Sequence, residues 1–141
     1  MKILVIEDSL TDRKVIEKAI NQANRLSKFN EVALIDYAYN LHSAIEMIEK
    51  NQYDVALVDL TLPDSSGVST IAKLRSITKI PLVIISGAYS RQAFETAVKG
   101  GVSRFILKGE NWTVGIATLI TRLLHEHQIL SKALGFIKNA A

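Results

Sequence analysis

The chain lacks cysteine, long apolar runs and blocks of five or more like charges over its 141 residues. Without cysteine it can form neither disulfide bonds nor a thiolate metal site, which permits an intracellular location. The apolar runs are too short for a signal peptide or a membrane-spanning helix, so we expect a cytoplasmic protein that does not insert into membranes. Its 17 basic and 14 acidic residues are scattered, and direct binding of nucleic acid is not expected.

What the chain does have is enough apolar material for one domain, since 48% of its residues are hydrophobic. Short apolar runs typical of buried strands alternate with segments of helical periodicity. Helices long enough to cross over predict a parallel sheet covered on both faces, which is a doubly wound α/β fold. We expect strands at 2–6, 32–38, 54–60, 81–85 and 102–107, helices after each of them, a loop at 63–67, and helix caps at Asn40, Ser90 and Asn111.

Chemically reactive side chains follow directly after four of these apolar runs. Glu7 and Asp8 follow the first run, Asp59 the third, Ser86 the fourth and Lys108 the fifth. The carboxyl ends of parallel strands meet at the edge of a sheet where ligands bind, so one crevice is expected to hold all five. Two carboxylates about 4 Å apart repel by roughly 4 kcal/mol, so such a group raises its pKa values or recruits a counter-ion. Magnesium, which prefers oxygen ligands, fits best.

These residues, in this order, resemble the response-regulator receiver domain of two-component signalling. The resemblance covers residues 1 to about 125 and also includes Phe105, which precedes Lys108 by three residues. It implies a flavodoxin-like fold with a five-stranded parallel sheet of order 2-1-3-4-5 and five helices. In that order the first and third strands are neighbours, which would bring Glu7, Asp8 and Asp59 together.

The resemblance also implies a role for each residue. Asp59 would accept a phosphoryl group from a histidine kinase or a histidine phosphotransfer protein. Mg²⁺, for which Mn²⁺ could substitute, would be bound by Asp8, Asp59 and the carbonyl of Thr61, with Glu7 acting through water. Lys108 would neutralise charge on the transferred oxygens. Ser86 would hydrogen-bond the phosphoryl group, and Phe105 would change rotamer as a switch that reshapes the fourth and fifth β-α units.

A receiver of this kind is a regulatory phosphoacceptor and not an enzyme, although it assists its own phosphoryl transfer and autodephosphorylation. Gly109 stands where the family usually has proline after the lysine. Thr61 and Ala88 occupy positions that tune acyl-phosphate lifetime, and neither has a carboxylate or amide to orient water, so a long-lived phosphoryl group is expected. The alternative is a receiver-shaped interaction module that acts without phosphorylation, although none of the acids, the hydroxyl or the lysine is lost.

The C-terminal segment, residues 126–141, is expected to extend the last helix beyond the domain of residues 1–125. An apolar stripe with alternating spacings of four and three runs through Ile116, Ile120, Leu123, His127, Leu130, Leu134 and Ile137. This spacing is typical of a coiled-coil seam, which favours a homodimer or a signalling-helix stub. An amphipathic helix that folds back on its own domain remains an alternative. His127 within the seam would make dimerisation sensitive to pH.

Overall fold

A five-stranded parallel sheet forms the centre of the protein in the computed structural model, which describes residues 1–28 and 31–140, with side chains up to Gly135. The order β2-β1-β3-β6-β7 confirms the predicted 2-1-3-4-5 topology, because β4 and β5 form a separate small sheet. The strands are β1 (Lys2–Ile6), β2 (Leu34–Ala38), β3 (Val55–Asp59), β6 (Leu82–Ser86) and β7 (Arg104–Leu107). Each lies within about two residues of its predicted position.

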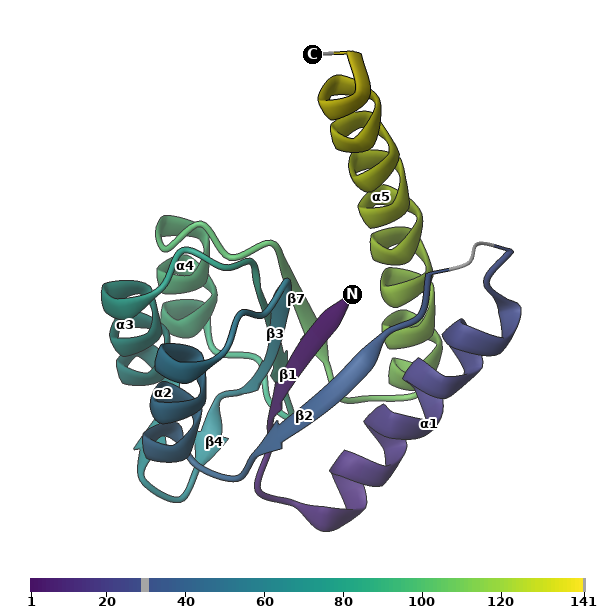
Figure 1. The fold of residues 1–141 in the computed structure, drawn as a ribbon. Coiled ribbons are helices and arrows are strands. Elements are labelled where there is room, and N and C mark those ends of the chain that lie inside the picture. The colour runs from purple at the N-terminus through teal and green to yellow at the C-terminus, as the bar shows by residue number, and fades with distance from the viewer. Residues whose placement is uncertain (29–30, 141) are drawn as a thin grey trace.

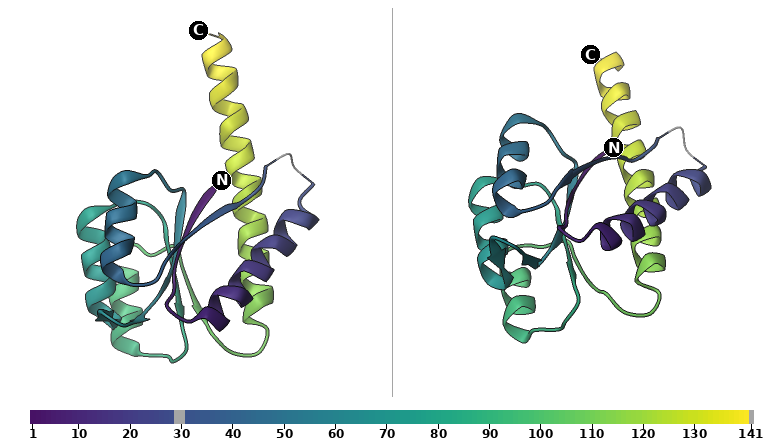
Figure 2. Two further views of the ribbon diagram at one scale, coloured as in Figure 1. Left: turned by 60° about the horizontal axis from the view of Figure 1, so that its bottom comes forward. Right: turned by 90° about the horizontal axis from the view of Figure 1, so that it is seen from below.

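Helices cover both faces of this sheet (Figures 1 and 2). Helix α1 (Leu10–Leu26) and helix α5 (Trp112–Ala140) lie on one face. Helix α2 (Leu41–Lys50), helix α3 (Gly67–Ile77) and helix α4 (Arg91–Lys99) lie on the other. Of the predicted caps, the Asn40 and Ser90 side chains accept hydrogen bonds from Ser43 and Ala93 N–H groups at the starts of α2 and α4.

Two hydrophobic clusters fill the layers between the sheet and its helices. Successive side chains of a strand point to opposite faces, so Leu4 and Ile6 of β1 pack towards α2, α3 and α4, whereas Ile3 and Val5 pack towards α1 and α5. Since both faces are buried, the central strands are apolar at almost every position. No helix in the described ranges is long and apolar enough to cross a membrane.

The loop expected at 63–67 contains part of a short hairpin. β4 (Thr61–Leu62) pairs antiparallel with β5 (Ser65–Ser66), with Pro63 and Asp64 at the turn. The Asp64 carboxylate accepts hydrogen bonds from the backbone N–H groups of Leu41 and His42, at 2.9 and 3.0 Å. These bonds hold the pKa of Asp64 below its usual value and fasten the hairpin to the start of α2.

Helix α5 continues well beyond the sheet, and its distal turns project from the body of the domain (Figure 1). Along the apolar stripe, Ile116 and Ile120 are fully buried, whereas Leu130 and Leu134 are 62% and 59% exposed. Where the helix leaves the body, His127 Nδ1 lies 3.1 Å from Glu31 Oε1, although the two are not aligned as a hydrogen bond. The Ile137 side chain lies outside the described residues. The first half of the stripe therefore packs on its own domain.

Candidate functional site

The ends of three strands meet at one crevice. Glu7 directly follows β1, Asp59 is the last residue of β3, and Lys108 directly follows β7. Backbone hydrogen bonds extend the sheet past two of the strands, since Glu7 N–H donates to Ala38 at 3.0 Å and Lys108 N–H donates to Ser86 at 2.7 Å. These bonds hold the two side chains at the carboxyl edge, where the sequence predicts the site.

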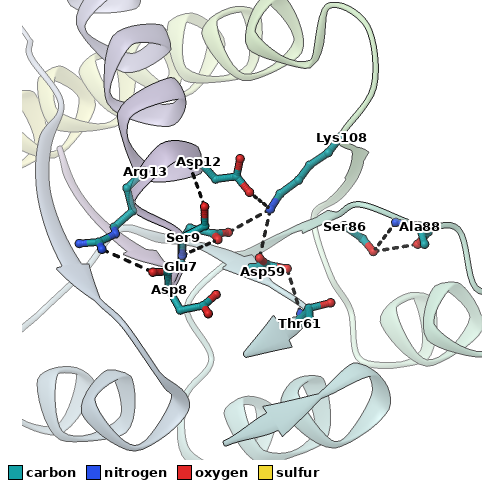
Figure 3. A network of polar contacts seen from close by, with 10 residues as sticks. All are labelled: Glu7, Asp8, Ser9, Asp12, Arg13, Asp59, Thr61, Ser86, Ala88 and Lys108. Atoms are coloured by element: carbon teal, nitrogen blue, oxygen red, sulfur yellow. Dashed lines mark hydrogen bonds and ion pairs between the residues drawn. The ribbon is translucent and has the colours of Figure 1, made fainter. Parts of the chain in front are cut away.

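The Lys108 ammonium is the centre of the site (Figure 3). Its Nζ donates hydrogen bonds to Asp12 Oδ2 at 2.7 Å, Asp59 Oδ2 at 3.1 Å and Glu7 Oε2 at 3.2 Å. An ammonium has three N–H donors, so each of them has a carboxylate acceptor. The Lys108 and Asp59 side chains are 16% and 6% exposed. Charges this deeply buried persist only when they are paired, as they are here.

The Asp59 carboxylate is fixed through both of its oxygens. Oδ2 accepts from Lys108, and Oδ1 accepts from the backbone N–H of Thr61 at 2.9 Å. The bond to Thr61 links the site to the β4–β5 hairpin. Asp59 therefore has a single defined orientation, with its carboxylate held between an ammonium and a backbone N–H group.

Burial changes the protonation of Glu7. Its side chain is 1% exposed, and this burial, followed by the neighbouring Asp59 carboxylate, raises the pKa of Glu7 from 4.5 to about 8. Lys108 and the backbone N–H of Ser9 oppose this shift only in part. Burial by itself would lower the pKa of Lys108, but the hydrogen bonds that Lys108 donates to Asp12 and Asp59 outweigh it, and the net shift of its pKa is upward. At neutral pH Lys108 is therefore charged, and the Glu7 carboxyl is mostly protonated.

The acids that meet at the site differ from the predicted set by one residue. Glu7, Asp12 and Asp59 each offer an oxygen within 4.8 Å of the others, a group of carboxylates that could hold a metal ion. The Asp8 side chain is exposed, and in the view of Figure 3 Asp59 lies between it and Lys108. Oxygen donors of this kind suit a hard divalent cation. In this structure the cation that contacts all three clustered acids is the Lys108 ammonium.

Asp12 was missed by the sequence analysis. It lies in the first turn of α1, where an acid is ordinarily explained by the helix dipole. The signal that could have found it is its position, because the first turn of the helix after β1 borders the carboxyl edge of the sheet.

Ser86 and Phe105 lie at the side of the site and contact other groups. The Ser86 hydroxyl, which is buried, donates to the Ala88 carbonyl at 2.8 Å and borders a cavity of about 430 Å³ that Thr61 also lines. Phe105 is partly buried against the core and meets Phe94 of α4 edge to face, with ring centroids 5.8 Å apart. The described hydrogen bonds of the Ser86 hydroxyl are thus with the loop after β6.

Comparisons with known proteins agree with this arrangement. The family described as response regulator receiver domain matches residues 3–120. The transcriptional regulatory protein KdpE of Staphylococcus aureus is 32% identical over 110 residues, which are 78% of this chain and 44% of that protein. The chain thus spans less than half the length of this curated relative.

Two solved structures share the fold. A two-component response regulator from Clostridium difficile is 25% identical, with a TM-score of 0.70 over 86% of this chain and 96% of that one. The Mn²⁺-bound form of response regulator Rcp1 has a TM-score of 0.74 at 15% identity, over 87% of this chain and 94% of that one. At that identity the second likeness concerns the fold alone.

The raised pKa of Glu7 predicts that stability depends on pH. Because its folded-state pKa lies above 4.5, the stabilisation by the protonated carboxyl is complete below pH 4.5 and is lost as pH rises through about 8. We expect Glu7→Gln, which cannot ionise, to gain about 4 kcal/mol in the free energy of unfolding relative to wild type between pH 5 and pH 9.

Urea unfolding of metal-free protein across this range measures the difference. Glu49→Gln, which removes an exposed acid on α2, serves as the control and should show no such trend. A constant difference between Glu7→Gln and wild type at all pH values would contradict the assignment.

Proposed function

Since the chain belongs to the response-regulator receiver family, we propose that Asp59 accepts a phosphoryl group from a histidine kinase or a histidine phosphotransfer protein. The observation that carries this proposal is the buried contact of 3.1 Å between Asp59 Oδ2 and the Lys108 ammonium. An Asp59 oxygen attacks the phosphorus of a phosphohistidine, the P–N bond breaks, and an acyl phosphate forms. Lys108 neutralises the charge on the transferred oxygens.

We further propose that Mg²⁺ is the cofactor, with Mn²⁺ as a substitute. Asp8, Asp59 and the carbonyl of Thr61 would hold the ion directly, and Glu7 would act through water. Besides the mostly protonated Glu7, the acids Asp8, Asp12 and Asp59 lie at or beside the crevice against one contacting ammonium, so the site carries excess negative charge. The bound ion would supply positive charge at the transferred phosphoryl oxygens.

Phosphorylation would act as a switch through Ser86 and Phe105. To reach a phosphoryl group on Asp59, the Ser86 hydroxyl must give up its bond of 2.8 Å to the Ala88 carbonyl. The cavity of about 430 Å³ beside Ser86 offers space for the loop after β6 to move. Movement of Phe105 would break its edge contact with Phe94 and alter the surface of α4. The phosphoryl group would shift the population towards this second state through its contacts with Ser86 and Lys108.

The rival is an interaction module that acts through the same fold without phosphorylation. Such a module needs no buried acceptor and no paired ammonium. The retention of Glu7, Asp59 and Lys108 in one contact network favours the phosphoacceptor, because burying ionisable groups costs stability and such groups cluster at functional sites.

Replacement of Asp59 tests the proposal directly. We expect Asp59→Asn to abolish phosphoryl uptake from acetyl phosphate in Mg²⁺ buffer, because the amide is not a nucleophile for phosphorus. Intact-mass spectrometry measures the uptake, and Glu110→Gln, which removes an exposed acid near Lys108, is the control that should be labelled like wild type. A folded wild-type protein that takes up no phosphoryl group would favour the rival module.

The lifetime of the acyl phosphate is a second test. We expect slow loss of the phosphoryl group in wild type, because Thr61 and Ala88 cannot orient a water molecule as a carboxylate or amide would. Ala88→Asn should shorten the lifetime several-fold, whereas Ala88→Leu, of similar size but without an amide, should not. Equal lifetimes in these two variants would contradict this explanation.

We also propose that the projecting part of α5 binds a second copy of the chain. Leu130 and Leu134 continue the stripe of Ile116 and Ile120 beyond the domain and expose it to solvent. Two leucines per chain form a small contact, so we expect a weak dimer whose population depends on protein concentration.

Sedimentation velocity over a range of concentrations tests this contact. We expect Leu134→Glu to remove the dimer, because it places a charge in the apolar stripe. Ile129 is 53% exposed but points away from the stripe, so Ile129→Glu is the matched control and should leave the dimer intact. Loss of the dimer in both variants, or in neither, would contradict the proposed contact.

A further inference from the structure

Asp12 makes the shortest contact with the Lys108 ammonium, although the proposed phosphoacceptor chemistry assigns it no role. Its carboxylate lies 2.7 Å from Nζ, compared with 3.1 Å for Asp59 and 3.2 Å for Glu7. The two residues are 96 positions apart in the chain, so the contact depends on the tertiary fold. The Ser9 hydroxyl accepts from the Asp12 N–H at 3.2 Å and caps α1, which fixes the backbone at this point.

The contact restricts the direction of the ammonium. Lysine carries its charge on a flexible stem of four carbons, with three donors at a single nitrogen. Two donors are directed to Glu7 on one element and to Asp12 on another, which leaves the third directed at Asp59 Oδ2. Without Asp12, Nζ would keep only its contacts with Glu7 and Asp59, and the flexible side chain of Lys108 could change rotamer.

Trp112 also borders the ammonium. Lys108 Nζ lies 5.7 Å from the centroid of the Trp112 ring, within the range of a cation–π interaction. Trp112 is the single tryptophan of the chain. We therefore expect its fluorescence to respond to a change in the position of the Lys108 ammonium.

We propose that Asp12 is a positioning residue, which holds the Lys108 ammonium towards Asp59 and towards the oxygens of a phosphoryl group carried there. This inference rests on the proposed function of Asp59. Asp12 is suited to the task because its side chain is about one third exposed, at 30%, so its charge is solvated at little cost when Lys108 shifts. Glu7, which is deeply buried, lacks this freedom. The gain is preorganisation, because the ammonium is aimed before the phosphoryl group arrives.

The test compares Asp12→Ala and Asp12→Asn with wild type in the initial rate of phosphoryl uptake from acetyl phosphate with Mg²⁺. We expect about a tenfold loss for Asp12→Ala, the size of one charge-assisted hydrogen bond at a partly exposed site. Asp12→Asn should lose less, because its amide oxygen still accepts from Nζ. Glu49→Gln removes the same charge far from the crevice and should keep the wild-type rate.

A double variant with Lys108→Met tests whether Asp12 acts through Lys108 or through a separate effect on the structure. Lys108→Met alone should slow uptake more than Asp12→Ala, and adding Asp12→Ala to it should cause no further loss, because the effect passes through Lys108. Additive losses would overturn the proposal. An unchanged rate in Asp12→Ala would also overturn it. A faster rate would overturn it as well, because Asp12 would then compete with the phosphoryl group for the ammonium.

Trp112 emission provides a measurement that does not need phosphoryl transfer. In metal-free protein, Asp12→Ala and Lys108→Met should change the emission in the same way, and Asp12→Asn should change it less. If wild type takes up no phosphoryl group, the proposed function fails, and this emission series still decides whether Asp12 holds Lys108. Emission in Asp12→Ala identical to wild type would overturn the positioning role.

Discussion

The buried Lys108 ammonium is the interaction on which the arrangement of the site depends. Its charge is tolerated because carboxylates supplied by β3, by the residue after β1 and by α1 surround it. These segments converge only if β1 lies beside β3 and β7 follows β6, as the sheet order provides. A change in the register of β3 by one residue would turn Asp59 away from the ammonium and leave the Asp59 charge without this partner.

The balance of charge explains how phosphorylation of Asp59 could change the contacts of Lys108 and Ser86. Before phosphorylation, Lys108 is shared among three acids, and burial, followed by the neighbouring Asp59, raises the pKa of Glu7 in spite of this sharing. A phosphoryl group would compete for the same ammonium and for the Ser86 hydroxyl. Both donors end neighbouring strands, and the Ser86 carbonyl already accepts from the Lys108 N–H at 2.7 Å. This bond links the backbones of the two residues directly at the sheet edge.

The sequence was sufficient for the fold and for most of the site, for reasons that particular residues make clear. Buried parallel strands are apolar on both faces, so runs such as Ile3 to Ile6 identify themselves, and the polar residues that follow mark the carboxyl edge. The β4–β5 hairpin was missed because strands of two residues have no periodicity. Asp12 was missed because helical periodicity places it among polar surface positions, and only the fold brings Lys108 to it.

The apolar stripe on α5 could not be assigned from its spacing, and its geometry restricts the direction of a partner helix. Packing on a sheet and packing on a partner helix require the same apolar face, so spacing cannot distinguish them. Ile116 and Leu134 are five helical turns apart and point the same way, and Ile116 faces its own core. Suppose that the α5 helix of a second copy packed on Leu134 and ran parallel to this α5. Its N-terminal half would then lie along the Ile116 side of this helix, in the space that the sheet occupies. Any second copy on this stripe must therefore run antiparallel, with its domain beyond the end of α5.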